Sequence, residues 1–460
     1  MEALLAAGVN AVRINMSHGT HDEKRQDIEM ARAAAAKLDL PLAVLVDLSG
    51  PKIRTGGLRD HRPVELRAGE SFTITTRPVD GDNNIVSTNY PDLPRVVTPG
   101  SRLLLDDGAI ALNVVSKDKT DVVSQVLNGG MLSDHKGINL PGVALPIASL
   151  TEKDRIDLKW AVSQGVDYIA LSFVRRAEDC LQARELIREA GGHAPLVAKI
   201  EKAEAIDHLD EIINAADGVM VARGDLGVET SVELVPVYQK QIIEKAVLAG
   251  KMVITATQML QSMISNPRPT RAEASDVANA VWDGTDAVML SNETAVGRYP
   301  VATVETMNRI IVSAESARRS DAERARKLLF RQSGRVSRAL CEAAVFAAEE
   351  MGTTVTAVFT ESGVMARRLS ALRPHQRIIA LTQSAEVRCA LSLVWGVESL
   401  ITPRASSTEE MLTAGEISLM SAGVKRGETI VVMAGRLSGL GLSTSVSIYT
   451  IGGETTARRA

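Results

Sequence analysis

The sequence predicts an α/β protein built on a TIM-type (β/α)8 barrel that lacks its first strand, with an inserted small all-β lid domain and a carboxyl-terminal α/β domain. Three observations predict this architecture. Strand-like apolar runs alternate with helical stretches over the first two thirds of the chain, as in a parallel sheet. Short alternating runs with frequent turn dipeptides interrupt that series once. A second α/β series follows after residue 328.

The barrel is predicted from seven strand-like segments: 9–16, 42–48, 167–173, 195–201, 218–224, 252–258 and 287–293. Helical stretches lie between most of them: 23–38, 152–164, 177–190, 203–215, 235–249 and 272–283. A closed barrel of this kind has eight strands, and residues 1–8 have the pattern of the tail of a helix. We therefore expect the first strand and its loop to be absent from this sequence.

Two carboxylates and a lysine follow two consecutive apolar runs. Lys199 and Glu201 end the run at 196–198, and Asp225 follows the run at 218–222. Because parallel neighbours end at the same edge, these side chains should emerge together at the barrel mouth. Two oxygen donors beside an ammonium suit a hard divalent cation that carries a phosphorylated or carboxylated substrate. An exposed salt bridge among the three residues would give the same pattern.

Further polar residues share this position at the strand ends, more regularly than core packing requires. They are Arg13, Asn15, Ser17, Asp47, Ser172, Thr257, Ser291 and Glu293. Their convergence on one mouth predicts a binding site there.

Composition and charge exclude several classes of protein. At 460 residues the chain should form two or three domains. A net charge of -4 with 3% aromatic residues argues against a nucleic-acid partner. Three scattered cysteines favour a reducing compartment over a disulfide framework or zinc site. We find neither an apolar run that would span a bilayer nor a signal peptide at the start, and therefore expect a cytoplasmic protein without a membrane partner.

The domain boundaries follow from these changes of pattern. The barrel is expected at 1–51 and 142–314, the lid domain at 52–141 and the carboxyl-terminal domain at 328–460. The insertion follows the carboxyl end of a strand, so it should lie over the mouth and exclude water as a lid. A passive insertion is the alternative.

The carboxyl-terminal domain has one feature of interest, a strand-to-helix turn whose free amides could bind an anion: Thr360, Glu361, Ser362 and Gly363. An ordinary helix N-cap would look the same.

Several long segments, taken together and in order, resemble the signature segments of the pyruvate kinase family. They are RINMSHG at 13–19, DLSGPKIRTG at 47–56, KGINLPG at 136–142, KIE at 199–201, MVARGDLG at 220–227, ATQML at 256–260, NPRPTRAE at 266–273 and MLSNETA at 289–295. The resemblance covers nearly the whole chain. It implies phosphoryl transfer from phosphoenolpyruvate to ADP, giving pyruvate and ATP in glycolysis, with Mg²⁺ or Mn²⁺ as cofactor.

The resemblance also implies roles for the mouth residues. Glu201 and Asp225 would hold the metal, while Lys199 and Arg13 would neutralise the moving phosphoryl group. The amides of Gly224 and Asp225 would receive the substrate carboxylate. The family's proton relay to the enolate corresponds to Thr257, which also lies beside that carboxylate, and Ser291. The positions that resemble nucleotide-facing residues are His18, Arg54, Lys136 and Asn15.

One departure from the family concerns K⁺. Many members hold K⁺ near positions that correspond to Asn15, Ser17 and Asp47, and carry Glu and Thr where this chain has Lys52 and Leu48. A lysine ammonium can supply the positive charge of the monovalent cation. We therefore expect activity without added K⁺. A solvated residue at the lid hinge is the alternative reading of Lys52.

A second departure concerns control by an effector. The turn at 360–363 resembles the family's effector-phosphate loop, but Glu361 stands where binders of fructose 1,6-bisphosphate often have lysine. The segment 435–441 also lacks the tryptophan of the loop that closes over that sugar. We do not expect activation by fructose bisphosphate. A sugar monophosphate, a nucleotide monophosphate or no effector remain open.

The expected absence of a first strand has two explanations. The true start could lie upstream, or the chain could be a truncated, catalytically impaired homologue that acts in binding or assembly. Another metal-dependent barrel enzyme acting on phosphoenolpyruvate or pyruvate would share Glu201 and Asp225 but would not need a nucleotide. The family resemblance further implies a homotetramer.

Overall fold

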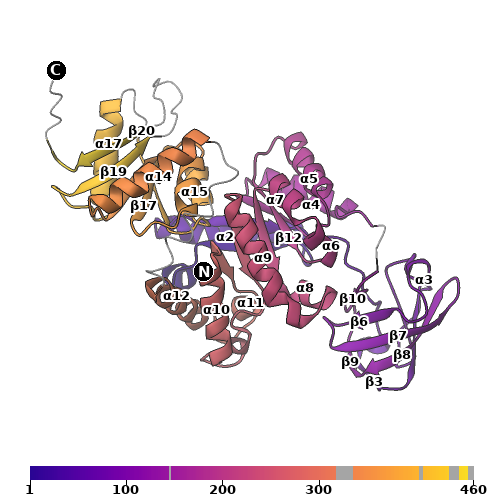
Figure 1. Ribbon diagram of the computed structural model, residues 1–460. Helices are drawn as coiled ribbons and strands as arrows, with labels where there is room; N and C mark the ends of the chain where they lie inside the picture. Colours follow the sequence, from indigo (N-terminus) through magenta and orange to yellow (C-terminus); the bar gives the residue numbers. More distant parts are fainter. Residues whose placement is uncertain (144–146, 318–334, 404–407, 435–444, 454–460) are drawn as a thin grey trace.

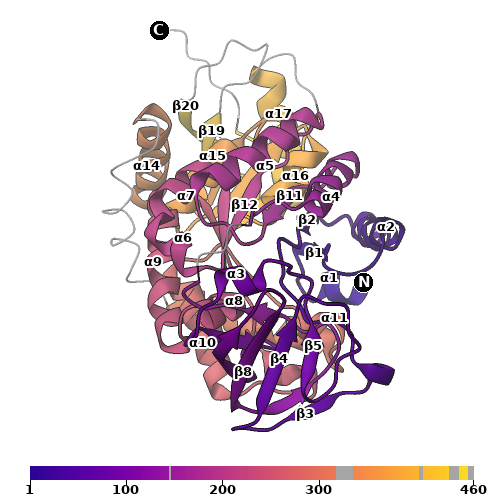
Figure 2. The same ribbon diagram turned by 90° about the vertical axis from the view of Figure 1, so that its right-hand side faces the viewer.

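The computed structural model describes residues 1–143, 147–317, 335–403, 408–434 and 445–453. Figure 1 shows three parts, with the lid and the carboxyl-terminal domain at opposite ends of the molecule and the barrel between them. The view in Figure 2 agrees, with lid strands at one end and helix α17, Thr408–Ser421, at the other.

The barrel sheet has seven strands in the order β1-β2-β11-β12-β13-β14-β15, and every pairing is parallel. Their bounds are β1 Ala11–Asn15, β2 Ala43–Asp47, β11 Tyr168–Leu171, β12 Leu196–Ile200, β13 Gly218–Ala222, β14 Met252–Ala256 and β15 Ala287–Met289. Every residue of the inner strands β2, β11, β12, β13 and β14 is buried, as expected for a parallel sheet covered on both faces. The predicted α/β class and parallel sheet are confirmed.

Helices surround this sheet, most of them on its outer face. They are α1 Glu2–Ala6, α2 His21–Lys37, α4 Glu152–Ser163, α5 Ala177–Glu189, α6 Ala203–Asp207, α7 Leu209–Ala215, α8 Arg223–Glu229, α9 Val235–Leu248, α10 Arg271–Asp283, α11 Asn292–Ala295 and α12 Pro300–Ala317. Helices α2, α4 and α10 begin with capping boxes at Thr20, Thr151 and Thr270. Each threonine side chain accepts the backbone N–H of the acidic residue three positions later, and the side chain of that residue accepts the backbone N–H of the threonine.

Some predicted element boundaries are wrong. The helix expected at 203–215 is two helices, α6 and α7, because the backbone at His208 leaves the helical region. The strands expected at 218–224 and 287–293 end earlier, at Ala222 and Met289, and a short helix begins at Arg223 and another at Asn292. The residues after these strands therefore lie in the loops and short helices of the barrel mouth.

Three aspartates tie neighbouring barrel strands together at their amino ends. The Asp167 carboxylate accepts the N–H of Val44 at 2.7 Å, and the Asp167 N–H donates to the Val44 carbonyl at 3.0 Å. The same reciprocal pair of bonds joins Asp217 to Leu196 and Asp286 to Val253. These pairs fix strand β2 against β11, β12 against β13, and β14 against β15 at the end of the barrel opposite the mouth.

The lid contains a six-stranded sheet in the order β10-β6-β7-β8-β4-β5 and a two-stranded sheet of β3 and β9. Its elements are β3 Val64–Leu66, β4 Ser71–Thr75, β5 Ile85–Ser87, α3 Leu93–Val96, β6 Arg102–Leu105, β7 Ile110–Lys117, β8 Asp121–Asn128, β9 Gly130–Leu132 and β10 Ile138–Asn139. It buries an apolar core of its own, which includes Phe72, Ile74 and Leu103.

The carboxyl-terminal domain has a five-stranded sheet in the order β18-β17-β16-β19-β20, antiparallel only between β19 and β20. Its described elements are α14 Arg335–Glu350, β16 Val355–Phe359, α15 Val364–Ala371, β17 Arg377–Thr382, α16 Ala385–Leu391, β18 Val397–Ile401, α17 Thr408–Ser421, β19 Thr429–Ala434 and β20 Ser445–Thr450. The sequence reading missed β18, and the boundary expected at 328 lies outside the described residues.

Arg373 joins this domain to the barrel. Its guanidinium contacts the Asp286 carboxylate at 3.0 Å and the Gly284 carbonyl at 2.6 Å, and it stacks 4.7 Å above the Trp395 ring. Tyr168 Oη donates to the Ala390 carbonyl at 2.7 Å in the same interface. Among the described helices, none is both long and apolar enough to cross a membrane.

Candidate active site

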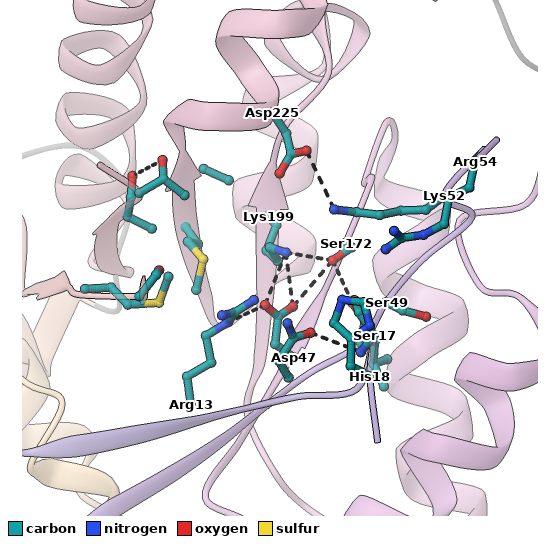
Figure 3. Close-up of a pocket in the computed structure, with 18 residues that line it drawn as sticks. Arg13, Ser17, His18, Asp47, Ser49, Lys52, Arg54, Ser172, Lys199 and Asp225 are labelled. Carbon is teal, nitrogen blue, oxygen red and sulfur yellow. Dashed lines mark hydrogen bonds and ion pairs between the residues drawn. The ribbon is translucent and has the colours of Figure 1, made fainter. Parts of the chain in front are cut away.

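A cavity of about 110 Å³ lies at the carboxyl ends of the barrel strands. Figure 3 shows side chains from many of the strands pointing into it. The lining residues are Arg13, Asn15, Ser17, His18, Asp47, Leu48, Ser49, Lys52, Arg54, Ser172, Lys199, Met220, Ala222, Asp225, Ala256, Thr257, Met289 and Ser291. Most of the residues that the sequence placed at the mouth therefore meet in one cavity, as the position of parallel strand ends requires.

Lys199 occupies the centre of this cavity (Figure 3). Its Nζ lies 3.1 Å from Asp47 Oδ1, 2.8 Å from Glu201 Oε1 and 2.8 Å from Ser172 Oγ. Burial alone would lower the pKa of Lys199, but the charges of Asp47 and Glu201 together raise it above its usual value. The ammonium form is therefore favoured, and three oxygen atoms hold it in one place.

Asp47 is the counter-ion of two cations. Arg13 Nε donates to Asp47 Oδ2 at 2.6 Å, while Lys199 contacts the other carboxylate oxygen. Burial would raise the pKa of Asp47, but Lys199 and Arg13 hold it below its usual range. Asp47 was predicted as part of a monovalent-cation site. In this structure its carboxylate positions Arg13 and Lys199 beside the cavity.

Glu201 and Asp225 are the residues that could hold a divalent cation. Glu201 is fully buried, and its Oε2 accepts the Phe173 N–H at 2.7 Å. Asp225 is more open and faces Lys52, whose Nζ lies 3.9 Å from Asp225 Oδ1. Burial raises the pKa of Glu201, and the nearby charge of Asp225 raises it further, against the effect of Lys199. A cation bound between the two carboxylates would favour the ionised form of both.

Glu201 and Asp225 suit Mg²⁺ or Mn²⁺ if the substrate supplies the remaining ligands. Carboxylate oxygens are the protein ligands that hard cations prefer, and Mg²⁺ is typically bound through one or two carboxylates plus substrate phosphates. Within the described ranges no group of three or more His, Cys, Asp or Glu side chains could hold a metal ion. Two carboxylates alone leave room for substrate oxygens and water.

Thr257 follows strand β14 in a strained conformation, with φ of 72°. Its hydroxyl donates to the Ala256 carbonyl at 2.6 Å and accepts the Gly224 N–H at 2.8 Å. Arg223 holds the same turn by donating to the Thr257 carbonyl at 2.7 Å. The Gly224 amide, which the resemblance assigned to the substrate carboxylate, is thus bonded to Thr257 in this structure.

Glu293 positions Ser291, and the sequence reading did not assign it this role. The buried Glu293 carboxylate accepts the N–H of Ser291 at 2.7 Å and the N–H of Leu260 at 3.2 Å. It therefore joins the loop after β15 to the loop after β14, where Thr257 lies. In the sequence, only the position of Glu293 two residues after Ser291 pointed to this contact.

Of the four nucleotide-facing positions, His18, Arg54 and Asn15 line the cavity. Burial lowers the pKa of His18, and the charges of Arg54 and Lys52 lower it further. Lys136 does not line the cavity, because its Nζ is paired within the lid with Asp106 Oδ1 at 2.9 Å.

The monovalent-cation region also meets at the mouth. Asn15, Ser17 and Leu48 line the cavity, and Asn15 Oδ1 accepts the Ser17 N–H at 3.0 Å. Lys52 points toward Asp225 from the lid hinge (Figure 3), with its Nζ 6.0 Å from the centre of the Phe173 ring. This ammonium is thus directed at the mouth.

Asp154 of helix α4 supports the loop after strand β2, and the sequence reading missed it. Its Oδ1 accepts the Gly50 N–H at 3.1 Å and the Ser49 hydroxyl at 3.3 Å. The capping box Thr151 to Asp154 was visible in the sequence, but the contact with a loop about a hundred residues earlier was not.

The turn at 360–363 is built as a local cap. Thr360 Oγ1 accepts the Gly363 N–H at 2.9 Å, and Gly363 has φ of 75° immediately before α15. The segment at 435–441 lies outside the described residues. The effector role of the turn stays a prediction.

The fold and the cavity define an α/β-barrel enzyme whose site lies at the carboxyl ends of the strands and is lined by cationic and acidic side chains. Two family models match the chain: "Pyruvate kinase, barrel domain" over residues 1–304 and "Pyruvate kinase, alpha/beta domain" over residues 338–448. The chain belongs to the pyruvate kinase family.

Similar proteins agree with this assignment. The chain is 42% identical over 459 residues to the pyruvate kinase of Sporosarcina psychrophila, covering 98% of this chain and 78% of that protein. It is 44% identical over 436 residues to the pyruvate kinase of Geobacillus stearothermophilus, covering 94% and 74%. It is 42% identical over 462 residues to that of Staphylococcus aureus strain MRSA252, covering 99% and 78%.

Proposed function

We propose that this chain transfers the phosphoryl group of phosphoenolpyruvate to ADP in glycolysis and then protonates the enolate to give pyruvate. The observation that carries the proposal is the cluster of Lys199, Arg13, Asp47 and Asp225 in one cavity, with the buried Glu201 paired to Lys199 just behind the cavity wall. Phosphoryl transfer needs little covalent chemistry from the protein, so that positioning and charge stabilisation supply most of the catalysis.

Each residue has a distinct part in this mechanism. Lys199 and Arg13 face the phosphoryl group and neutralise the charge that builds on its oxygens as it moves. Glu201 and Asp225 would hold Mg²⁺ or Mn²⁺, which would screen the substrate carboxylate and phosphate. Asp47 keeps both cations oriented before substrate arrives, so that little reorganisation is needed in the transition state.

Proton delivery completes the reaction. The enolate accepts a proton at its methylene carbon, and the hydroxyls of Thr257 and Ser291 line the cavity. We assign Thr257 the relay of a proton from water, with Ser291 beside it. The Gly224 and Asp225 amides at the start of helix α8 would receive the substrate carboxylate after the Gly224 bond to Thr257 is exchanged.

Lys199→Met tests the phosphoryl-transfer role. Removing a charge that acts in the transition state should lower kcat by at least about 10²-fold. Pyruvate production from phosphoenolpyruvate and ADP is followed with a lactate dehydrogenase coupled assay, beside Lys37→Met, which removes an exposed lysine that pairs with Glu2. Undiminished turnover in Lys199→Met would refute the assignment.

ADP dependence separates this function from its alternatives. A metal-dependent barrel enzyme that cleaves or joins carbon bonds would consume phosphoenolpyruvate without ADP. A catalytically impaired homologue would form no pyruvate in either case. We expect pyruvate formation that requires ADP and a divalent cation.

Activity without added K⁺ is part of the proposal, since Lys52 carries its ammonium to within 3.9 Å of Asp225. Assays in a tetramethylammonium buffer free of Na⁺ and K⁺ should show nearly full activity. A large stimulation by K⁺ would contradict the role of Lys52. The matched variant Lys52→Glu should lose activity in this buffer and regain part of it with K⁺.

The remaining finer assignments are a homotetramer, a cytoplasmic location and no activation by fructose 1,6-bisphosphate. Sedimentation velocity and cell fractionation test the first two. Titrating fructose bisphosphate, a sugar monophosphate and a nucleotide monophosphate into assays at subsaturating phosphoenolpyruvate tests the third, since Glu361 places a negative charge in the turn at 360–363.

A further inference from the structure

Three polar side chains meet where the lid contacts the barrel, outside the cavity described above. Asn139 of lid strand β10 donates through Nδ2 to Glu229 Oε1 at 2.8 Å. Lys202 Nζ lies 2.7 Å from the same oxygen atom. One carboxylate oxygen therefore binds both the lid and a lysine of the barrel.

The two barrel residues of this cluster belong to the segments that carry the candidate metal ligands. Lys202 directly follows Glu201 and precedes helix α6. Glu229 is the last residue of helix α8, whose first turn contains Asp225. The ion pair thus joins the end of strand β12 to the helix after strand β13, at the two places where the positions of Glu201 and Asp225 are set.

Burial makes these contacts strong. The side chain of Glu229 is 5% exposed and that of Lys202 is 18% exposed. A hydrogen bond to a charged group contributes more than a neutral one, and a buried charge without its partner is costly. Glu229 without Lys202 would be a buried, uncompensated carboxylate.

Phe173 extends the cluster to Glu201 itself. Lys202 Nζ lies 5.5 Å from the centre of the Phe173 ring, and the Phe173 N–H donates to Glu201 Oε2 at 2.7 Å. Phe173 has φ of 55°, which a non-glycine residue adopts only where its surroundings hold it. Lys202 is one of those surroundings.

We propose that Asn139, Glu229 and Lys202 form a latch, in which the Lys202–Glu229 pair positions the metal ligands Glu201 and Asp225 and the bond from Asn139 holds the lid in its position against the barrel. Lys202 and Glu229 are positioning residues, since neither lines the cavity. The metal part of the proposal rests on the proposed function; the lid part does not.

The lid part is tested with Asn139→Asp in the ligand-free protein. The aspartate is nearly isosteric but places a carboxylate against Glu229, so the lid should swing away. The matched control is Asn83→Asp, which introduces the same charge at an exposed position of the lid. Spin labels at Met131→Cys in the lid and Ile156→Cys in α4, both exposed positions, report the distance between lid and barrel. Cys389→Ser removes the half-buried native cysteine, while Cys180 and Cys341 are buried.

Pulsed electron resonance should show longer and broader label distances for Asn139→Asp than for Asn83→Asp. Asn139→Ala, which removes the bond without adding charge, should fall between them. If Asn139→Asp fails to fold by circular dichroism, Asn139→Ala alone decides the question. Label distances that coincide with those of the control would overturn the lid part.

The metal part is tested by the binding of Mn²⁺ alone, measured by electron paramagnetic resonance. Glu229→Gln keeps an acceptor for Asn139 but cannot neutralise Lys202, so the Mn²⁺ Kd should rise about tenfold, as for partners that orient metal ligands. Lys202→Met should behave alike, while Asn139→Ala should leave the Kd within about twofold. An unchanged Kd in Glu229→Gln would overturn this part. A wild-type chain that binds no Mn²⁺ would count against the metal assignment and the metal part together, and the label distances would still decide the lid part.

Discussion

Asp47→Asn should weaken both the folded barrel and catalysis, because Asp47 holds two cations at once. Its carboxylate oxygens lie 2.6 Å from Arg13 Nε and 3.1 Å from Lys199 Nζ. At an effective dielectric constant of about 20, two unit charges about 3 Å apart interact by about 5 kcal/mol before desolvation is counted. Breaking such a buried pair by removing one partner costs about 3–5 kcal/mol.

The lower part of that range applies here. Lys199 keeps Glu201 as a partner at 2.8 Å, and the Arg13 side chain is 28% exposed, so that water can solvate part of its charge. We therefore expect a loss of about 3 kcal/mol. For a unit of barrel size this lowers Tm by about 6–12 °C, at about 2–4 °C for each kcal/mol.

Catalysis should fall as well, because Arg13 would lose the bond that orients its guanidinium. A displacement of about 1 Å in a positioning group can cost about 10²-fold in rate. Differential scanning calorimetry and the coupled assay measure the two effects, with Asp22→Asn as the control, since Asp22 is exposed and pairs with the exposed Arg25. A Tm and turnover equal to those of Asp22→Asn would refute the counter-ion role of Asp47.

Three other substitutions probe the framework. Burial raises the pKa of Asp167 to about 6, so its ionised form destabilises the fold at higher pH. Asp167→Asn should have the same free energy of unfolding as the wild type below about pH 4, and should exceed it by up to about 3 kcal/mol once the pH reaches about 6. Urea unfolding that gives the same difference between variant and wild type at pH 4 and at pH 8 would contradict this. Arg373→Met leaves Asp286 buried without its cation and should cost about 3–5 kcal/mol, seen as an earlier calorimetric transition; an unmoved transition argues against it. Gly50→Ala should lower kcat at least several-fold, because its Cβ would lie 2.5 Å from the Phe173 ring; wild-type kcat would show that the loop adapts.

Each of these has a control within the chain. Gly250→Ala imposes a similar positive φ, 68° against 64°, with nothing near the new methyl group. Arg95→Met removes an exposed arginine with an exposed aspartate partner. Asp22→Asn serves again for Asp167. If a substitution changes stability or kcat no more than its control does, the change reflects backbone strain or loss of charge in general, not the contact under test.

The sequence predicted the arrangement of the barrel well because its signal is local. Buried parallel strands appear as apolar runs, and polar residues at their ends must share one edge of the sheet. Arg13, Asp47, Lys199, Thr257 and Ser291 accordingly line the same cavity.

The missing details depend on contacts between distant segments. Asp47 and Lys199 are 152 residues apart, and which cation Asp47 binds depends on distances that no spacing reveals. The break at His208 was missed because Ile206, Leu209 and Ile212 continue a helical apolar spacing across it. The helix that begins at Arg223 was missed because Gly224 and Asp225 in its first turn are weak helix formers. Lys136 was assigned to the nucleotide site by resemblance, but its pairing with Asp106 depends on the position of the lid.

The aspartate pairs at the amino ends of the strands have a consequence for how the barrel can evolve. A shift of one residue between β14 and β15 would turn every inward side chain outward, and the pair of hydrogen bonds between Asp286 and Val253 penalises that shift far from the mouth. The carboxyl ends of the strands, at the mouth, therefore need not set the strand register. Thr257 and Phe173 can keep unfavourable backbone angles at the mouth, and the mouth loops can change for new substrates without shifting the register of the barrel strands.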